Sequence, residues 1–213
     1  MIRVDCFTVS LDGYGAGSRQ SSDAPMGVGG ERLHGWAFAT RTFRQMFGQP
    51  GGSEGVDEGF AAAGMAGLGA WVMGRNMFAP SRGPWPDDGW RGWWGEDPPY
   101  HCPVHVLTHH PRAPLEMSGG TVFHFETGGL EVALQKAAND AGDRDVRIGG
   151  GVATVREALL GRLVDRVHLA VSPVLLGSGE ALWPGIDLDA LGYRVAQVVP
   201  GEGATHLVIG RVG

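Results

Sequence analysis

The sequence has few of the features that point to secretion, a membrane or nucleic acid. Its two cysteines, Cys6 and Cys102, are too few for a disulfide framework and are typical of a reducing cytoplasm. No apolar run approaches the roughly 18 residues of a membrane span, and the first residues lack the pattern of a secretory signal. The net charge is −6 without any Lys/Arg run, which excludes a broad nucleic-acid surface. We expect a cytoplasmic protein with a small-molecule partner.

Motifs for a Rossmann-type nucleotide site and for a metal site are also missing. The string nearest to G-x-G-x-x-G is MGVGGER at 26–32, which has Arg32 in the last glycine position and follows a loop instead of a strand. Residues 101–110 carry four histidines and one cysteine. They contain one close Cys–His pair and no second pair at zinc-finger spacing, so we expect no metal site.

Glycine, in contrast, is abundant, at 37 of 213 residues, against an average near 7%. The glycines are dispersed without a period among apolar segments, which fits neither collagen nor a disordered linker. Many of them must lie in turns. The glycine- and serine-rich segment 10–32 has a length usually found in functional loops.

Strand and helix patterns alternate along the chain. Alternation and short apolar runs predict strands at 2–9, 70–73, 104–108, 121–125, 145–149 and 164–171, with more strands in the last fifty residues. Amphipathic patterns predict helices at 33–47, 56–67, 129–141 and 152–161, the third with Thr127 as N-cap. No linker separates two cores. We therefore predict one domain over residues 1–213, an α/β three-layer αβα fold whose mixed sheet has antiparallel C-terminal strands.

Three consecutive glycines stand between a predicted strand and a predicted helix in DVRIGGGVATVREALL, 145–160. A backbone without side chains there lets main-chain N–H groups and the helix dipole face a phosphate. A tight turn that needs positive φ explains the same glycines equally well. The triplet alone does not choose between the two.

Two further strand ends carry groups that suit a phosphorylated ligand. In AWVMGRNMF, 70–78, Gly74 is followed by Arg75, whose donor fork suits phosphate, although a solvated arginine at a helix start is the alternative. In VLTHHP, Thr108, His109 and His110 offer partners for a ribose phosphate or an adenine edge. Ligands of open α/β sheets bind beyond the carboxyl ends of the strands. We expect these junctions to face one crevice.

Five segments resemble, in order and spacing, the dihydrofolate reductase-like fold: SLDG (10–13), AWVMGRNMF, PVHVLTHHP, DVRIGGGVATVREAL and LVDRVHLAVSPVLLGSG (163–179). The resemblance is closer to the reductase domain of the bifunctional riboflavin biosynthesis deaminase-reductase, and it covers nearly the whole chain. It implies an NADPH-dependent oxidoreductase that acts on CH–NH or C=N/C=O type groups of a small planar heterocycle, with hydride passing from NADPH to the C=N or C=O carbon. The riboflavin precursor 5-amino-6-(5-phosphoribosylamino)uracil and a pterin are the substrates it suggests.

The resemblance also implies where the cofactor binds. The pyrophosphate is expected between the two helix starts, and Arg75 is expected near the adenosine 2′-phosphate, which predicts a preference for NADPH over NADH. Thr108 and His109 are expected to flank the same end. The predicted cofactor-binding residues are Gly74, Arg75, Asn76, Met77, Thr108, His109, Gly150, Gly151, Val152, Ala153 and Thr154.

The chain departs from the related reductases at three places. The stretch RLHGWAF lacks the acidic residue that dihydrofolate reductases carry in their first helix, Met77 replaces a usual hydroxyl residue, and Gly149 replaces a usual acidic residue. These differences count against folate as the substrate, and they leave undecided whether the substrate carries a ribityl phosphate. An NADP(H)-binding protein without reductase chemistry, regulatory or of unknown role, is therefore the alternative function.

Asp12 in SLDG is the candidate catalytic acid or base, because the resemblance places this loop near the nicotinamide. Such a group is worth about 10²–10⁴ in rate. The alternative is an Asx-turn residue that precedes Gly13. His34 either faces the substrate or is a hydrogen-bonded, partly buried neighbour.

The segment 85–94, WPDDGWRGWW, is rich in tryptophan. It fits a lid over a planar ring, and it fits equally well a flap on the sheet edge or a subunit contact. Related reductases commonly pair through their later strands, so we expect a homodimer.

Overall fold

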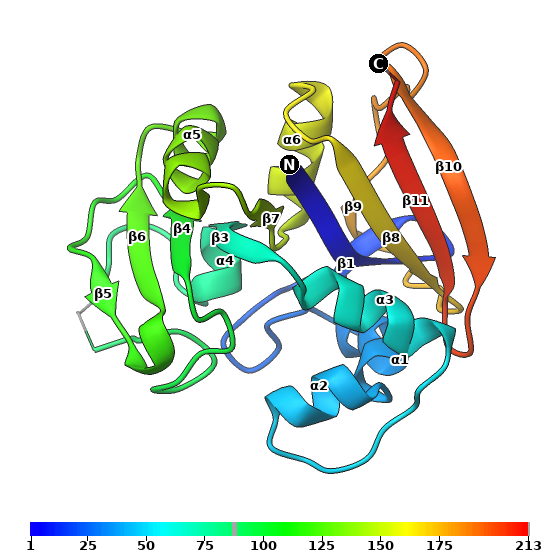
Figure 1. Ribbon diagram of the computed structural model, residues 1–213, viewed down its shortest axis with the longest axis horizontal. Helices are drawn as coiled ribbons and strands as arrows, with labels where there is room; N and C mark the ends of the chain where they lie inside the picture. Colours follow the sequence, from blue (N-terminus) through cyan, green and yellow to red (C-terminus); the bar gives the residue numbers. More distant parts are fainter. Residues whose placement is uncertain (87–88, 213) are drawn as a thin grey trace.

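A nine-stranded mixed sheet runs through the molecule (Figure 1). The structure, a computed structural model, describes residues 1–86 and 89–212. The sheet strands are β1 (Ile2–Ser10), β3 (Leu68–Gly74), β4 (Pro103–Leu107), β5 (Leu115–Glu116), β6 (Val122–Glu126), β7 (Asp145–Ile148), β8 (Arg166–Ser172), β10 (Tyr193–Pro200) and β11 (Thr205–Arg211). Their order is β10-β11-β8-β1-β7-β3-β4-β6-β5. Two short strands, β2 (Tyr14–Gly17) and β9 (Gly179–Ala181), form a separate sheet.

The central strands are parallel and the C-terminal strands are antiparallel. From β8 through β1, β7, β3 and β4 to β6, each neighbouring pair is parallel. β11 pairs antiparallel with β8, and β10 with β11. The predicted mixed sheet with antiparallel C-terminal strands is confirmed. Because parallel strands point the same way, their carboxyl ends meet at one edge of the sheet.

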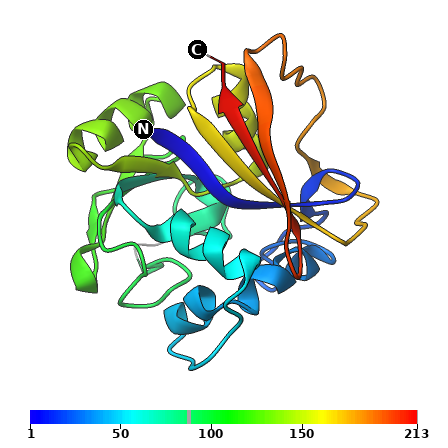
Figure 2. The same cartoon turned by 45° about the vertical axis from the view of Figure 1, so that its right-hand side comes forward.

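Helices cover both faces of the sheet (Figures 1 and 2). Val167 and Leu169 of β8 pack in the core with residues of α5 and α6, whereas Ala170 packs with Trp36 on the opposite face. This division follows from the alternation of side chains along a strand. The helices are η1 (Gly30–His34, 3-10), α1 (Gly35–Phe38), α2 (Arg41–Met46), α3 (Val56–Met65), α4 (Arg75–Phe78), η2 (Ser118–Gly120, 3-10), α5 (Leu130–Ala141) and α6 (Val152–Leu160).

The predicted single helix over 33–47 is wrong. The chain forms η1, α1 and α2 instead, with a break at Thr40. The Thr40 hydroxyl donates to the carbonyl of Ala37 (2.6 Å) and accepts from the N–H of Phe43 (3.3 Å). A threonine that bonds to the backbone on both sides ends one helix and caps the next. Apolar periodicity does not reveal such a break.

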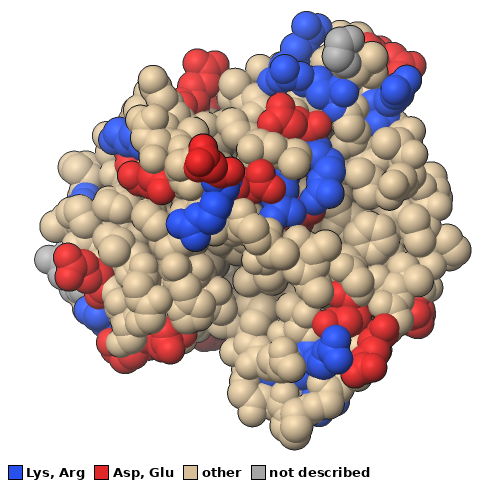
Figure 3. Space-filling view, in the orientation of Figure 1, with Lys and Arg blue, Asp and Glu red and all other residues tan. Residues whose placement is uncertain are grey.

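The N-cap predicted for α5 is also wrong. The helix begins after Gly129, which has a φ of 85° and no capping side chain, and Thr127 lies two residues earlier. The other predicted strands and helices agree with the structure to within two residues at each end. In the described ranges, every helix is too short or too polar to cross a membrane. Charged side chains of both signs are interspersed on the face shown in Figure 3.

The tryptophan-rich segment packs on the sheet. The Trp85 ring lies 5.2 Å from the Phe125 ring, edge to face, and the Trp90 indole N–H donates to the Phe78 carbonyl (2.7 Å). Residues 87–88 of the segment lie outside the described residues. None of the segment's described residues lines the large cleft of the molecule. These contacts favour the flap interpretation over the lid.

Candidate active site

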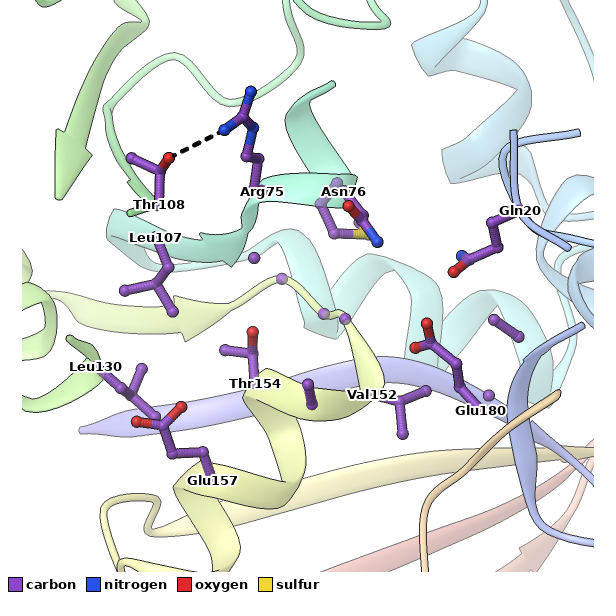
Figure 4. A pocket seen from close by; sticks show the side chains of 18 of the residues that line it. Gln20, Arg75, Asn76, Leu107, Thr108, Leu130, Val152, Thr154, Glu157 and Glu180 are labelled. Carbon is purple, nitrogen blue, oxygen red and sulfur yellow. Dashed lines mark hydrogen bonds between the residues drawn. The ribbon is translucent and has the colours of Figure 1, made fainter. Parts of the chain in front are cut away.

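A cleft of about 690 Å³ opens at the carboxyl ends of β3, β4, β6 and β7. Its volume lies in the range of small-molecule and cofactor sites. Arg75 and Thr108 lie at one end of the cleft, and Gln20 and Glu180 lie at the other, with Thr154 between them (Figure 4). We call these the Arg75 end and the Glu180 end.

The strand-end junctions that the sequence predicts to share a crevice do meet here. They come from three separate parts of the chain, and the sheet brings them to the same edge. All predicted cofactor-binding residues line the cleft: Gly74, Arg75, Asn76, Met77, Thr108, His109, Gly150, Gly151, Val152, Ala153 and Thr154.

The glycine triplet serves both the turn and the opening. Gly150 and Gly151 have φ values of 136° and 84°, which side chains rarely tolerate. Gly74, which faces the triplet, must be glycine because of the space before α6. A Cβ on Gly74 would stand 2.8 Å from the hydroxyl oxygen of Thr154. The two junctions are joined directly, since the N–H of Gly74 donates to the carbonyl of Gly150 (3.3 Å). Backbone at Gly74 and Gly150 therefore forms part of the cleft floor.

The start of α6 offers unpaired donors to the cleft. Gly151 is its N-cap and supplies no side-chain acceptor. The N–H groups of the first helical turn lack partners within the helix, and the helix dipole adds partial positive charge there. Val152, Ala153 and Thr154 line the cleft at this point. A phosphate fits these donors.

Arg75 is held in place at its end of the cleft. Its guanidinium lies 3.7 Å over the Trp85 ring and donates to the carbonyl of Gly83. It also reaches the Thr108 hydroxyl at 3.5 Å (Figure 4). Burial lowers the pKa of Arg75 from its ordinary value, but an arginine stays protonated in proteins. A fixed cation therefore stands at this end, supported by the tryptophan-rich segment.

Gln20 and Glu180 are cleft residues that the sequence does not single out. Gln20 belongs to the long loop 10–32, whose length is the one signal for it. Glu180 follows directly on the characteristic stretch 163–179 and lies on β9, opposite Ala16 of β2. Only the pairing of these two short strands brings it into the cleft.

Two further cleft residues, His34 and Cys6, are uncharged at neutral pH. Burial lowers the pKa of His34 to about 4, so its imidazole is neutral. Burial raises the pKa of Cys6 to about 11, so it is a thiol and not a nucleophilic thiolate. His34 lines the cleft and is partly buried, so its position fits both possibilities raised by the sequence.

A buried hydrogen-bond chain supports the cleft wall beneath Cys6. Cys6 has a φ of 54° where the register of β1 shifts, and its N–H donates to Nδ1 of His168 (3.0 Å). His168 Nε2 lies 3.0 Å from His206 Nδ1, and His206 Nε2 lies 2.8 Å from the Asp57 carboxylate. Because the Cys6 N–H must donate, His168 accepts at Nδ1 and donates at Nε2. The chain thus has one direction, from Cys6 to Asp57, with His168 neutral.

This arrangement predicts a loss of stability in acid. Burial lowers the pKa of His168 from 6.5 to about 3, so below pH 6.5 the unfolded chain binds a proton that the folded protein excludes. The free energy of unfolding should fall as the pH drops from about 6.5 to about 3, by up to about 1.4 kcal/mol per unit from this group. Urea unfolding at pH 7.5 and pH 5 measures the loss. In His168→Gln, where residue 168 does not titrate, the free energy of unfolding should fall less between these two pH values. An equal fall in both proteins contradicts the assignment of the loss to His168.

Asp12 does not line the cleft. Its exposed carboxylate accepts from the N–H groups of Leu176 (3.1 Å) and Gly177 (2.7 Å) and from the Ser10 hydroxyl (2.5 Å). The Ser10 hydrogen bond is the largest cause of its lowered pKa. Asp12 therefore ties the exit of β1 to the loop between β8 and β9, a structural role that competes with the predicted catalytic one.

An Asp12→Ala variant separates the two roles. If Asp12 only ties the loops, NADPH oxidation with the best acceptor should fall less than about tenfold, because no proton transfer is lost. Removal of a catalytic acid or base costs about 10²–10⁴ in rate. Steady-state kinetics of Asp12→Ala and Asp12→Asn give the answer, and a loss of at least two orders of magnitude in both would restore the catalytic assignment.

His105, one of the histidines of 101–110, contacts two carboxylates. His105 lies 3.0 Å from Glu126 and 3.0 Å from Asp140, and Lys136 completes this group with a 2.6 Å contact to Glu126. Within the two described ranges, no three His, Cys, Asp or Glu side chains are grouped so that they could hold a metal ion.

The mixed sheet, its helical layers and the cleft at its edge define a dihydrofolate reductase-like fold, and solved structures share it. A riboflavin biosynthesis protein of Shewanella sp. PV-4 superposes with a TM-score of 0.60 at 22% identity over 100% of both chains. Dihydrofolate reductase of Enterococcus faecalis, solved with NADP(H), gives 0.56 at 16% identity over 99% of this chain and 96% of its own. No curated protein matches the chain significantly.

The family follows from the sequence match. The model of the RibD C-terminal domain matches residues 5–205, so the chain belongs to the RibD C-terminal domain family. The predicted resemblance is confirmed at the level of both fold and family.

Proposed function

We propose that this protein is an NADPH-dependent reductase of a small planar heterocycle. The observation that carries the proposal is the convergence of the predicted cofactor residues, from three distant segments, on one cleft with Arg75 fixed at its end. Membership of the RibD C-terminal domain family supports a reductase of the riboflavin-pathway type. The proposed substrates are a riboflavin-precursor pyrimidine or a pterin-like ring.

Different residues along the cleft bind different parts of the cofactor. The backbone N–H groups at the start of α6 and the bare edge at Gly74 hold the pyrophosphate. Arg75 and Thr108 bind the adenosine 2′-phosphate. NADPH supplies the hydride when bound. The chain orients the reacting rings toward the Glu180 end and limits the access of water.

Binding without turnover is the second candidate function. One observation favours it: His34 and Cys6, two cleft residues that titrate, have pKa values of about 4 and about 11, both far from the neutral range suited to proton transfer. NADPH oxidation assays with dihydrofolate, the pyrimidine riboflavin precursor and simple quinones distinguish the two functions. Turnover of any acceptor supports the reductase, whereas NADPH binding without turnover supports the alternative.

We also propose a cytoplasmic homodimer. β10 is an edge strand of the sheet, and Val195 and Val198 on it are 47% and 62% exposed. Apolar side chains on an open strand edge suit pairing with a second copy. Analytical ultracentrifugation tests this proposal, and a monomer at micromolar concentration excludes it.

A further inference from the structure

The basic side chains of the cleft gather at the Arg75 end. Among the described residues that line the cleft, the arginines and lysines are Arg75 and Arg82. Arg82 adjoins Gly83, whose carbonyl binds the Arg75 guanidinium, so both belong to the same end. A substrate phosphate needs such cations, and the proposed function already assigns Arg75 to the cofactor. No arginine or lysine among the described residues lines the Glu180 end of the cleft, where a second phosphate would need one.

The Glu180 carboxylate is unpaired within the described part of the chain. It makes no hydrogen bond or ion pair there, although the side chain is half-buried. Glu126, at the β6 end of the cleft wall, differs because Lys136 and His105 contact it at 2.6 Å and 3.0 Å. A carboxylate only accepts hydrogen bonds. Glu180 is thus ready to accept donors from a ligand.

Gln20 adds a second acceptor at this end. Its amide NH₂ donates to the carbonyl of Pro25 (3.0 Å), which orients the side chain and leaves its carbonyl oxygen without a partner in the described residues. Gln20 and Glu180 point into the same part of the cleft (Figure 4). Two acceptors that face one space select for a ligand with donors.

The strand that carries Glu180 is held firmly. The N–H of Leu182 donates to the carbonyl of Gly13 (2.9 Å), and the Arg156 guanidinium on α6 donates to the carbonyls of Leu182 and Pro184. Opposite Glu180 stands Ala16, whose small side chain leaves the carboxylate room to reach the cleft. The backbone next to Glu180 is therefore fixed before a ligand binds.

We propose that the Glu180 end binds a neutral or cationic nitrogen heterocycle that presents exocyclic amino donors, and that Glu180 is the residue that selects it. A ring that presents carbonyl oxygens at the same positions, or one that carries a phosphate, is disfavoured. The inference rests on the proposed function, because it takes this end as the substrate half. Because a phosphate is disfavoured at this end, it chooses an amino-bearing ring without a phosphate over the phosphoribosylated pyrimidine.

A matched pair of fluorescent rings tests the proposal. 2,4-Diaminopteridine carries exocyclic amino donors at the two positions where 2,4-dioxopteridine carries carbonyl acceptors, and the dioxo ring keeps N–H donors only at N1 and N3. Their dissociation constants are measured by fluorescence titration at pH 7, with and without saturating NADPH, for the unaltered protein, Glu180→Gln and the exposed-site control Glu131→Gln. The diamino ring should bind at least about tenfold more tightly than the dioxo ring, since a hydrogen bond to a charged group contributes about 1.5–3 kcal/mol.

Glu180→Gln should lose at least about tenfold for the diamino ring and change less than about threefold for the dioxo ring. Glu131→Gln should match the unaltered protein. Glu180→Asp keeps the charge and should keep the preference for the diamino ring. It provides the test if Glu180→Gln does not fold. Equal affinity for the two rings, or an unchanged preference in Glu180→Gln, overturns the proposal. Absence of NADPH binding overturns the proposed function instead, and the titrations without NADPH still test Glu180.

Discussion

Replacing Arg75 with alanine is expected to weaken NADPH binding about 10- to 150-fold and to leave NADH binding within about threefold. A hydrogen bond to a charged group contributes about 1.5–3 kcal/mol, and the 2′-phosphate is the one group by which the two cofactors differ. The stacking of Arg75 on Trp85 at 3.7 Å already orders the side chain, so little of this energy is lost to entropy. Fluorescence titration with both cofactors measures the ratio.

The control is Arg194→Ala, which removes an exposed arginine of β10 away from the cleft. It should leave both dissociation constants unchanged. Equal losses of NADPH and NADH affinity in Arg75→Ala would show that Arg75 does not bind the 2′-phosphate. Lys in place of Arg75 keeps the charge without the donor fork and should recover part of the preference.

Replacing Gly74 with valine is expected to lower the affinity for both cofactors by about two orders of magnitude or more. Even the first added carbon would stand 2.8 Å from the Thr154 hydroxyl oxygen, and the two methyl groups beyond it would enter the opening before α6. The φ of Gly74 is −68°, which valine adopts without strain. The obstacle is therefore steric and lies where the pyrophosphate is expected.

Gly59→Val is the matched control. Gly59 is exposed in α3, and a Cβ there would meet no atom within 4 Å. Valine is also the better helix former, so this variant should fold and bind NADPH normally. If Gly74→Val folds, as its circular dichroism would show, and binds NADPH with unchanged affinity, then the backbone floor of the cleft is not the pyrophosphate site.

The sequence predicts which residues meet at the Arg75 end and the floor of the cleft, because these residues follow strand ends. Gly74 and Gly150 each follow a recognisable apolar strand, and the carboxyl ends of parallel strands share an edge wherever the chain places them. The sheet order itself is not needed for this inference. Thr108 follows the same rule on a third strand.

The Glu180 end is harder to predict, because nonlocal contacts place its residues. Glu180 enters the cleft through a three-residue strand that pairs across more than 160 positions with β2. The sequence predicts a catalytic Asp12 in SLDG. In the structure its carboxylate accepts from the N–H groups of Leu176 and Gly177 in a distant loop, and it does not line the cleft. The Thr40 break has a different cause, because it depends on two local hydrogen bonds, to Ala37 and from Phe43, that hydropathy does not reveal.

The measurement that tests the central claim most directly is a titration of the unaltered protein with NADPH and with NADH, followed by nicotinamide fluorescence. The structure predicts saturable NADPH binding that is at least about tenfold tighter than NADH binding, because Arg75 adds a charge-assisted contact to the 2′-phosphate. Equal affinities, or no saturation with either cofactor at millimolar concentration, would contradict it.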